Sequence, residues 1–168
     1  MKASKEKLLS LTYGAIVAAL YVALTWISNL LGLASGAVQL RLGEALCVLP
    51  FFFPSTSVGL FLGCLISNLT MSCAPLDIAL GPIATIIGAY LGSKMKSKWL
   101  VPLPTVLSNT IIVPFVIIIS YTNEALTLPV YSLTALGVFI GEVASAYVIG
   151  MILLLSMEKH SIFKNKKR

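Results

Sequence analysis

The sequence predicts an all-α integral membrane protein, folded as a compact bundle of six transmembrane helices with both termini in the cytoplasm. Of its 168 residues, 58% are hydrophobic and only 11% are charged, whereas soluble domains usually carry about 25% charged residues. The apolar residues lie in long uncharged runs, and a helix needs about 20 such residues to cross a bilayer. Polar tails occur only at 1–7 and 158–168. We therefore expect a single transmembrane domain over residues 1–168.

Six apolar runs are the expected helices, at 8–30, 43–53, 56–72, 76–93, 99–121 and 130–157. The boundary between the second and third runs is the weakest, because 43–72 could also form one long helix. Pro54 and the hydroxyl residues after it indicate a turn followed by a helix N-cap. The run 43–53 would span only about 16 Å as an α-helix. It should therefore be shielded by protein or extended by the preceding loop.

The basic residues predict the orientation of the helices. They cluster at the N-terminus, at 94–98 and from 159 onwards, with Arg41 as the exception, and basic loops stay in the cytoplasm. These clusters share one side only if an even number of crossings separates them, which requires the turn at Pro54. Three loops then lie outside, at 31–42, 73–75 and 122–129. Because orientation accounts for the net charge of +6, no nucleic-acid partner is needed.

Ionisable residues inside the apolar runs are the candidate site, because such groups are costly in a bilayer. Glu44 and Asp77 begin their expected helices on the outer side, where water and the helix dipole offset part of the cost. Asp77 could also simply cap its helix. Glu142 lies in the middle of the last run, where a charge costs about 3 kcal/mol. It should face either a ligand pocket open to the outside or Arg41, with an Arg41–Glu44 ion pair as a further structural alternative.

Three amide side chains extend this candidate site, since each amide both donates and accepts hydrogen bonds. The expected substrate-binding residues are therefore Gln39, Arg41, Glu44, Asn68, Asp77, Asn109 and Glu142.

The absence of metal-binding and nucleotide-binding motifs limits the functions that the sequence can support. The cysteines Cys47, Cys64 and Cys73 are odd in number and lack metal-ligand spacing, so we interpret them as small apolar packing residues. The apolar runs contain no histidine and the chain has no P-loop motif. No metal, cofactor or intrinsic energy source is indicated. A substrate-binding subunit fits better than an enzyme; an intramembrane enzyme with Glu142 as general base, or a purely structural subunit, are the alternatives.

Small residues recur at a spacing of four in several runs, which lets helices approach closely. The stripes at Gly59 and Gly63, at Gly88 and Gly92, and around Gly141 are expected to pack internally. The stripe on the first helix is ambiguous, because it could face either the bundle or a partner protein. It consists of Ala15, Ala19 and Ala23.

One element of the sequence is specific enough to suggest a family. The stretch V-Q-L-R-L-G-E-A-L at 38–46, continued by V-L-P-F-F at 48–52, resembles the signature of the QueT family. These proteins are substrate-binding (S) components of energy-coupling-factor (ECF) transporters assigned to queuosine precursors. The segments 59–69, 77–85 and 141–143 are also similar, so the resemblance covers roughly 8–158. Gly43 and Pro82 depart from the family, in which serine is commoner at both positions.

The resemblance implies a ligand pocket near the outer face of a six-helix bundle in the bacterial plasma membrane. It also implies partners: a transmembrane coupling subunit driven by two ATPase subunits. S components of this kind often dock through an Ala-x-x-x-Ala pattern on the first helix. Ala15 and Ala19 match that pattern, which favours the partner-facing interpretation of this stripe.

The implied ligand is a 7-deazaguanine, such as 7-aminomethyl-7-deazaguanine, queuine or its nucleoside. A carboxylate suits the N–H donors of its guanine-like edge, an Arg or Asn side chain suits O6, and a second carboxylate suits a cationic aminomethyl group. We expect Glu142 to contact the N–H edge, with Glu44 or Asp77 as the alternative. An S component for another vitamin, such as riboflavin or thiamine, is a further alternative.

Overall fold

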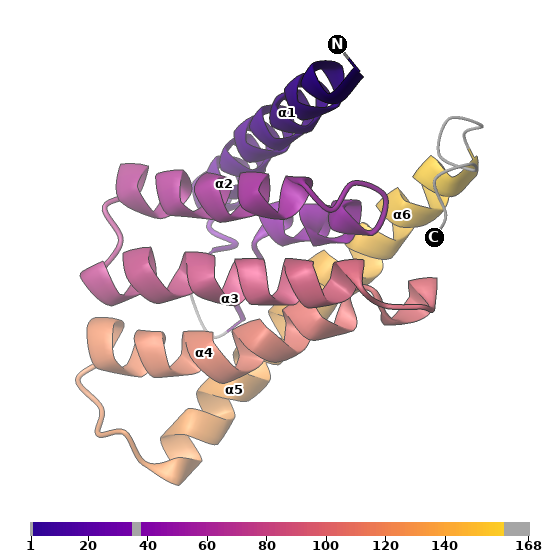
Figure 1. Ribbon diagram of the computed structural model, residues 1–168. Helices are drawn as coiled ribbons and strands as arrows, with labels where there is room; N and C mark the ends of the chain where they lie inside the picture. Colours follow the sequence, from indigo (N-terminus) through magenta and orange to yellow (C-terminus); the bar gives the residue numbers. More distant parts are fainter. Residues whose placement is uncertain (1, 35–37, 160–168) are drawn as a thin grey trace.

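The computed structural model describes residues 2–34 and 38–159, and every regular element within them is helical (Figure 1), as predicted. Residues 35–37 of the expected outer loop and the basic residues after Lys159 lie outside this part of the chain. The elements are α1 (Lys2–Leu30), η1 (Leu42–Phe51), α2 (Thr56–Thr70), α3 (Pro75–Ser93), η2 (Lys98–Leu100), α4 (Leu103–Tyr121), α5 (Leu128–Glu142), η3 (Val143–Ile149) and α6 (Gly150–Lys159).

Four helical stretches are long and apolar enough to cross a membrane: Ser4–Leu30, Pro75–Ser93, Lys98–Tyr121 and Leu128–Lys159. The last of them joins α5, η3 and α6 into one helix, where the sequence predicted a single helix at 130–157. A π-helical turn, η3, interrupts its α-helical register directly after Glu142. Such turns often occur at functional sites.

The two remaining apolar helices, η1 and α2, are shorter. Helix η1 is a 3-10 helix, and with a rise of about 2 Å per residue its ten residues span about 20 Å. Residues 43–50 are all buried, so η1 lies inside the bundle, as its short length led us to expect. Pro50 lies within η1, and the chain turns at Pro54 as predicted. The expected cap differs, because Ser55 makes no capping bond and the Thr56 hydroxyl instead donates to the Phe53 carbonyl at 2.7 Å.

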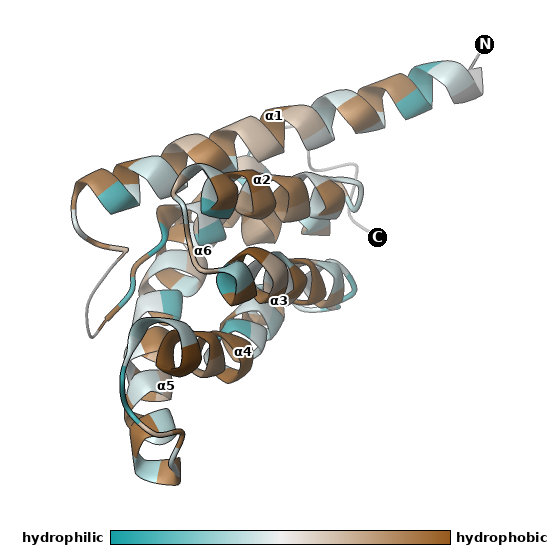
Figure 2. Cartoon of the chain, turned by 90° about the vertical axis from the view of Figure 1, so that its left-hand side faces the viewer, coloured by the Kyte–Doolittle hydropathy of each residue, from teal (hydrophilic) through white to brown (hydrophobic). Residues whose placement is uncertain are grey.

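Figure 1 shows α2, α3 and α4 as a row, which the α5–α6 helix crosses obliquely. Helix α1 lies against α2 and η1, and its N-terminal part extends beyond the other helices (Figure 2). Glycines make the close contacts: a Cβ on Gly59 would lie 2.2 Å from the Gly14 carbonyl oxygen, and one on Gly92 would lie 2.6 Å from the Val101 carbonyl oxygen. These two glycine stripes therefore pack internally, as predicted.

Consecutive long segments alternate in direction and create two distinct ends of the bundle. At the first, Trp26 at the end of α1 donates to Thr70 at the end of α2, at 3.2 Å. We call this the pocket end. At the other, which we call the basic end, Lys98 pairs with Glu158 at 2.9 Å. Helix α1 begins and α6 ends on the side of the basic end (Figure 1).

Candidate functional site

All seven candidate residues line one of two adjoining cavities at the pocket end. The inner cavity is lined by Gln39, Arg41, Glu44, Asn109 and Glu142, among others. The outer cavity is lined by Gln39, Arg41, Asn68 and Asp77, among others. Gln39 and Arg41 line both cavities and therefore lie between them. The residues come from six segments of the chain, which the fold brings together at one place: residues 38–41, η1, α2, α3, α4 and α5.

The two cavities differ greatly in size. The outer cavity has a volume of about 430 Å³, which lies within the range of small-molecule sites. The inner cavity has about 10 Å³, enough for a single water molecule. The outer cavity therefore has room for a small organic molecule, whereas the inner one has room for only one small group.

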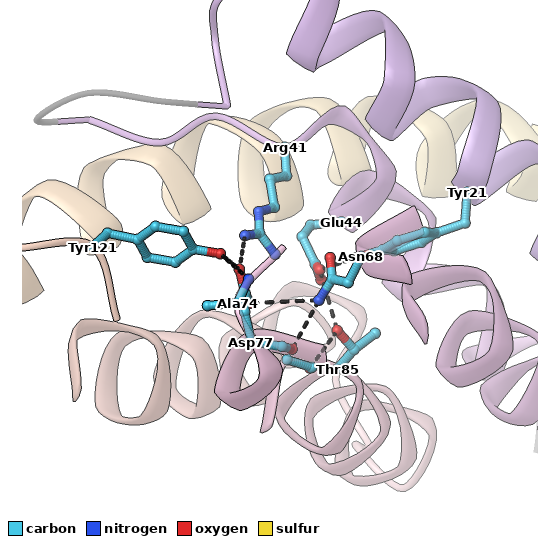
Figure 3. Close-up of polar contacts among 9 residues, drawn as sticks. Tyr21, Arg41, Glu44, Asn68, Ala74, Asp77, Thr85 and Tyr121 are labelled. Atoms are coloured by element: carbon cyan, nitrogen blue, oxygen red, sulfur yellow. Dashed lines mark hydrogen bonds and ion pairs between the residues drawn. The ribbon is translucent and has the colours of Figure 1, made fainter. Parts of the chain in front are cut away.

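Glu44 lines the inner cavity and accepts hydrogen bonds from three donors, two of which, Tyr21 and Thr85, are labelled in Figure 3. Its Oε1 accepts hydrogen bonds from the Tyr21 hydroxyl and from Thr85 Oγ1, the latter at 3.3 Å, and its Oε2 accepts from Cys47 Sγ at 3.1 Å. Glu44 is buried, and its position in the first turn of η1 directs it towards α1 and α3. Both of its oxygens thus already have donors within the protein.

Sequence reasoning missed Tyr21 and Thr85 as partners of Glu44, and it treated Cys47 as a packing residue only. One signal was available: a tyrosine within an apolar helix needs a partner for its hydroxyl when it is buried, and Tyr21 is 1% exposed. The structure describes all three cysteines as free, with Cys47 and Cys64 buried and Cys73 partly buried.

Arg41 forms its ion pair with Asp77, with 3.4 Å between Nη2 and Oδ2. This corrects both structural alternatives from the sequence, Arg41–Glu44 and Arg41–Glu142. Burial opposes the charged guanidinium, but Asp77 and the other anionic groups nearby outweigh that effect, so the pKa of Arg41 is raised. Tyr121 donates to the same Asp77 oxygen at 3.1 Å, as Figure 3 shows. The pair therefore joins the 38–41 segment to α3 and α4.

Asn68 fixes the first turn of α3 from the neighbouring helix. Its Nδ2 donates to the Asp77 carbonyl at 2.9 Å and lies 3.4 Å from the Asp77 Oδ1 (Figure 3). A Cβ on Gly81 would lie 2.8 Å from the same Nδ2, so a side chain there would displace the Asn68 amide. The Asp77 side chain makes no capping bond, because Ala74 occupies the N-cap position. Asp77 therefore acts through its contacts with Arg41, Tyr121 and Asn68.

Glu142 and Gln39 differ from the other site residues because each has a buried oxygen without a partner. Glu142 is 5% exposed, and its Oε2 has no hydrogen-bond donor, although Asn109 lies beside the carboxylate. Gln39 Oε1 is equally buried and unpartnered. The backbone of Gln39 rests directly on α5, since a Cβ on Gly141 would lie 1.9 Å from the Gln39 carbonyl oxygen. This contact places Gln39 beside Glu142 at the inner cavity.

The sequence of this chain matches the QueT transporter family over residues 11–159. The chain belongs to this family. It is also 35% identical over 88 residues to the queuosine precursor transporter QueT of Lactococcus lactis subsp. cremoris. That alignment covers 52% of each chain, so the chain spans about half the length of this relative. No solved structure matches. Membership of a transporter family, together with four helices of membrane-spanning length, makes the chain a multi-pass membrane protein.

Proposed function

We propose that this QueT family member captures a queuosine precursor, a 7-deazaguanine base or nucleoside, on the outside of the bacterial plasma membrane. The observation that carries the proposal is the pair of buried, unpartnered oxygens on Glu142 and Gln39, two residues that line the inner cavity next to the outer cavity of 430 Å³. A buried acceptor without a donor costs about 1–3 kcal/mol. A ligand that supplies N–H donors removes this cost. The name of the Lactococcus relative supports the same ligand class.

The outer cavity is chemically complementary to a guanine-like edge. Arg41 contributes only donors, which suits O6, and Asp77 contributes acceptors, which suit the N1 and N2 hydrogens. Both side chains line this cavity, where their ion pair holds them next to each other. An Arg and a carboxylate side by side thus offer the donor and acceptor pattern that such an edge requires.

The exposed face of α1 supports a role as the S component of an ECF importer. Ala15, Ala19 and Ala23 are all exposed, whereas Val17 and Tyr21 on the opposite face are buried. A stripe of small residues on the outside of a helix permits close approach by another transmembrane helix. We propose that a transmembrane coupling subunit, driven by two ATPase subunits, docks there during ATP-driven uptake.

Ligand binding by the purified chain tests this function. Native mass spectrometry and calorimetry in detergent should detect 7-aminomethyl-7-deazaguanine, recovered chemically unchanged, and no binding of riboflavin or thiamine. A folded preparation that binds a vitamin instead would assign the chain another ligand. Conversion of the bound compound would support the enzyme alternative.

A further inference from the structure

The inner cavity has room for one small group and offers that group two acceptors. Its volume of about 10 Å³ excludes a ring, and the buried oxygens without donors are Glu142 Oε2 and Gln39 Oε1. Glu44 also lines this cavity, but Tyr21, Thr85 and Cys47 occupy its oxygens. Any group that enters therefore meets Glu142 and Gln39 as the two lining residues with an acceptor oxygen that has no donor in the protein.

The charges around the site are not balanced. Three carboxylates, Glu44, Asp77 and Glu142, line the two cavities together with one cation, Arg41. Within the described ranges 2–34 and 38–159, Arg41 pairs with Asp77, and the other ion pair, Lys98–Glu158, lies at the basic end. A buried carboxylate without a cation is expensive in a low-dielectric interior. The inner cavity therefore favours a positive charge over a neutral donor.

We propose that the inner cavity is a subsite for a primary ammonium group on the arm of the ligand, while the bicyclic base occupies the outer cavity. This inference rests on the proposed function and reassigns Glu142 from the N–H edge of the base to the ammonium. Gln39 and Arg41 line both cavities, so a one-carbon arm extending from the base passes between them. Glu142 then supplies the counter-charge and Gln39 a second acceptor. The substrate class is a 7-deazaguanine with an unsubstituted aminomethyl arm.

Two competing occupants share the size but not the charge of this group. The exocyclic amino group of the base is also a one-atom donor, but it is neutral and leaves the carboxylate uncompensated. A water molecule fits as well, and if it occupied the inner cavity, the affinity for a ligand would not depend on the ligand's arm. These alternatives predict different responses to a ligand whose arm is equally long and uncharged.

Calorimetry with two ligands and matched variants separates these cases. 7-Aminomethyl- and 7-cyano-7-deazaguanine share the base edge, and their arms have the same number of heavy atoms. The unmodified protein should bind the aminomethyl compound at least about 30-fold more tightly than the cyano compound. This factor corresponds to about 2 kcal/mol, the lower limit for a buried charge pair. Glu142→Gln should abolish this preference and change the affinity for the cyano compound less than about threefold. Glu6→Gln, the same change on an exposed residue of α1, should leave both affinities unaltered.

Gln39→Leu provides a second test that keeps the carboxylate in place. It removes one acceptor and should lower the preference for the aminomethyl compound about tenfold, as expected for a hydrogen bond to a charged group. Equal binding of both ligands by the unmodified protein would overturn the ammonium subsite, and so would an equal loss for both ligands in Glu142→Gln. Binding of neither ligand would instead contradict the proposed function itself.

Discussion

The side chain of Arg41 connects three segments of the chain at the boundary between the two cavities. It pairs with Asp77 on α3, and Asp77 in turn accepts a hydrogen bond from Tyr121 on α4. Tyr121 also accepts the backbone N–H of Ala74 at 2.9 Å. The carboxylate of Asp77 is therefore the common partner, and the hydroxyl of Tyr121 is a secondary support.

Replacement of Asp77 should therefore be much more harmful than replacement of Tyr121. Asp77→Asn leaves the guanidinium of Arg41 largely buried without its counter-charge, which should lower the free energy of unfolding by about 3 kcal/mol. Tyr121→Phe removes only a neutral hydroxyl group and should lower the free energy of unfolding by about 1 kcal/mol. Thermal unfolding in detergent measures both. Equal destabilisation by the two variants would contradict the central role of the ion pair.

Gly141 allows a second residue-scale test, because its missing side chain lets Gln39 approach α5. A Cβ there would lie 1.9 Å from the Gln39 carbonyl oxygen, so Gly141→Ala must displace the 38–41 segment. We expect ligand affinity to fall at least about tenfold, since about 1.4 kcal/mol of misplaced contacts suffices. Gly14→Ala is the matched control, because its Cβ would have an ordinary 3.9 Å contact. Unchanged affinity in Gly141→Ala would show that Gln39 is not positioned by this contact.

At the scale of the elements, α1 has one buried and one exposed face, to which the proposed function assigns separate roles. One face packs against α2 and η1 and contributes Tyr21 to the site. The other carries the alanine stripe and remains exposed. Because the two faces are distinct, a change on the exposed face should affect assembly without affecting ligand binding.

Bulky residues in the alanine stripe test this separation. Ala15→Trp or Ala19→Trp should block association with the coupling subunit and leave calorimetric ligand binding unchanged, because a large ring prevents close helix approach. Ile16→Trp is the control, since it places the same ring on an exposed position about 100° around the helix. Assembly is measured by co-purification with the coupling and ATPase subunits. Transport that survives both alanine replacements would exclude this stripe as the docking surface.

At the scale of the whole molecule, the alternating segments give the bundle two ends, which we propose lie on opposite sides of the membrane. The basic end carries Lys94, Lys96 and Lys98, and the positive-inside rule assigns it to the cytoplasm. In the proposed orientation the pocket end faces outside, where a ligand would arrive. The proposed count of six crossings adds the two short helices η1 and α2 to the four long stretches, with η1 shielded by its neighbours.

Cysteine labelling of sealed cells tests this topology. A membrane-impermeant maleimide should label Asn123→Cys and should miss Ser97→Cys, with Cys73 replaced by alanine in the background. Burial already raises the pKa of Cys73, which slows its reaction because the thiolate is the reactive form. Ser161, expected to be protected as well, lies beyond the described residues. Labelling of Ser97→Cys in intact cells would overturn the six-crossing arrangement.

The sequence by itself predicted the all-helical class of the fold and seven polar residues that line the two cavities. Hydropathy and charge are properties of each segment of the chain, so a long apolar run predicts a helix however that helix packs against the others. The cost of polar groups in a bilayer singled out Glu44, Asp77 and Glu142 before any contact was known. The short run 43–53 likewise required shielding by protein, and η1 is buried as that argument demands.

Only the tertiary structure decided which contacts each of these residues makes. Any of three carboxylates could have paired with Arg41, and in the structure Asp77 does. Which of them pairs depends on helix positions within a few ångströms, and close contacts at glycines set those positions. The same packing gives Glu44 its donors and leaves Glu142 Oε2 without one. It also separates a 10 Å³ cavity from one of 430 Å³. Hydropathy and spacing contain no such distances, because they describe each helix separately, whereas a site depends on how the helices meet.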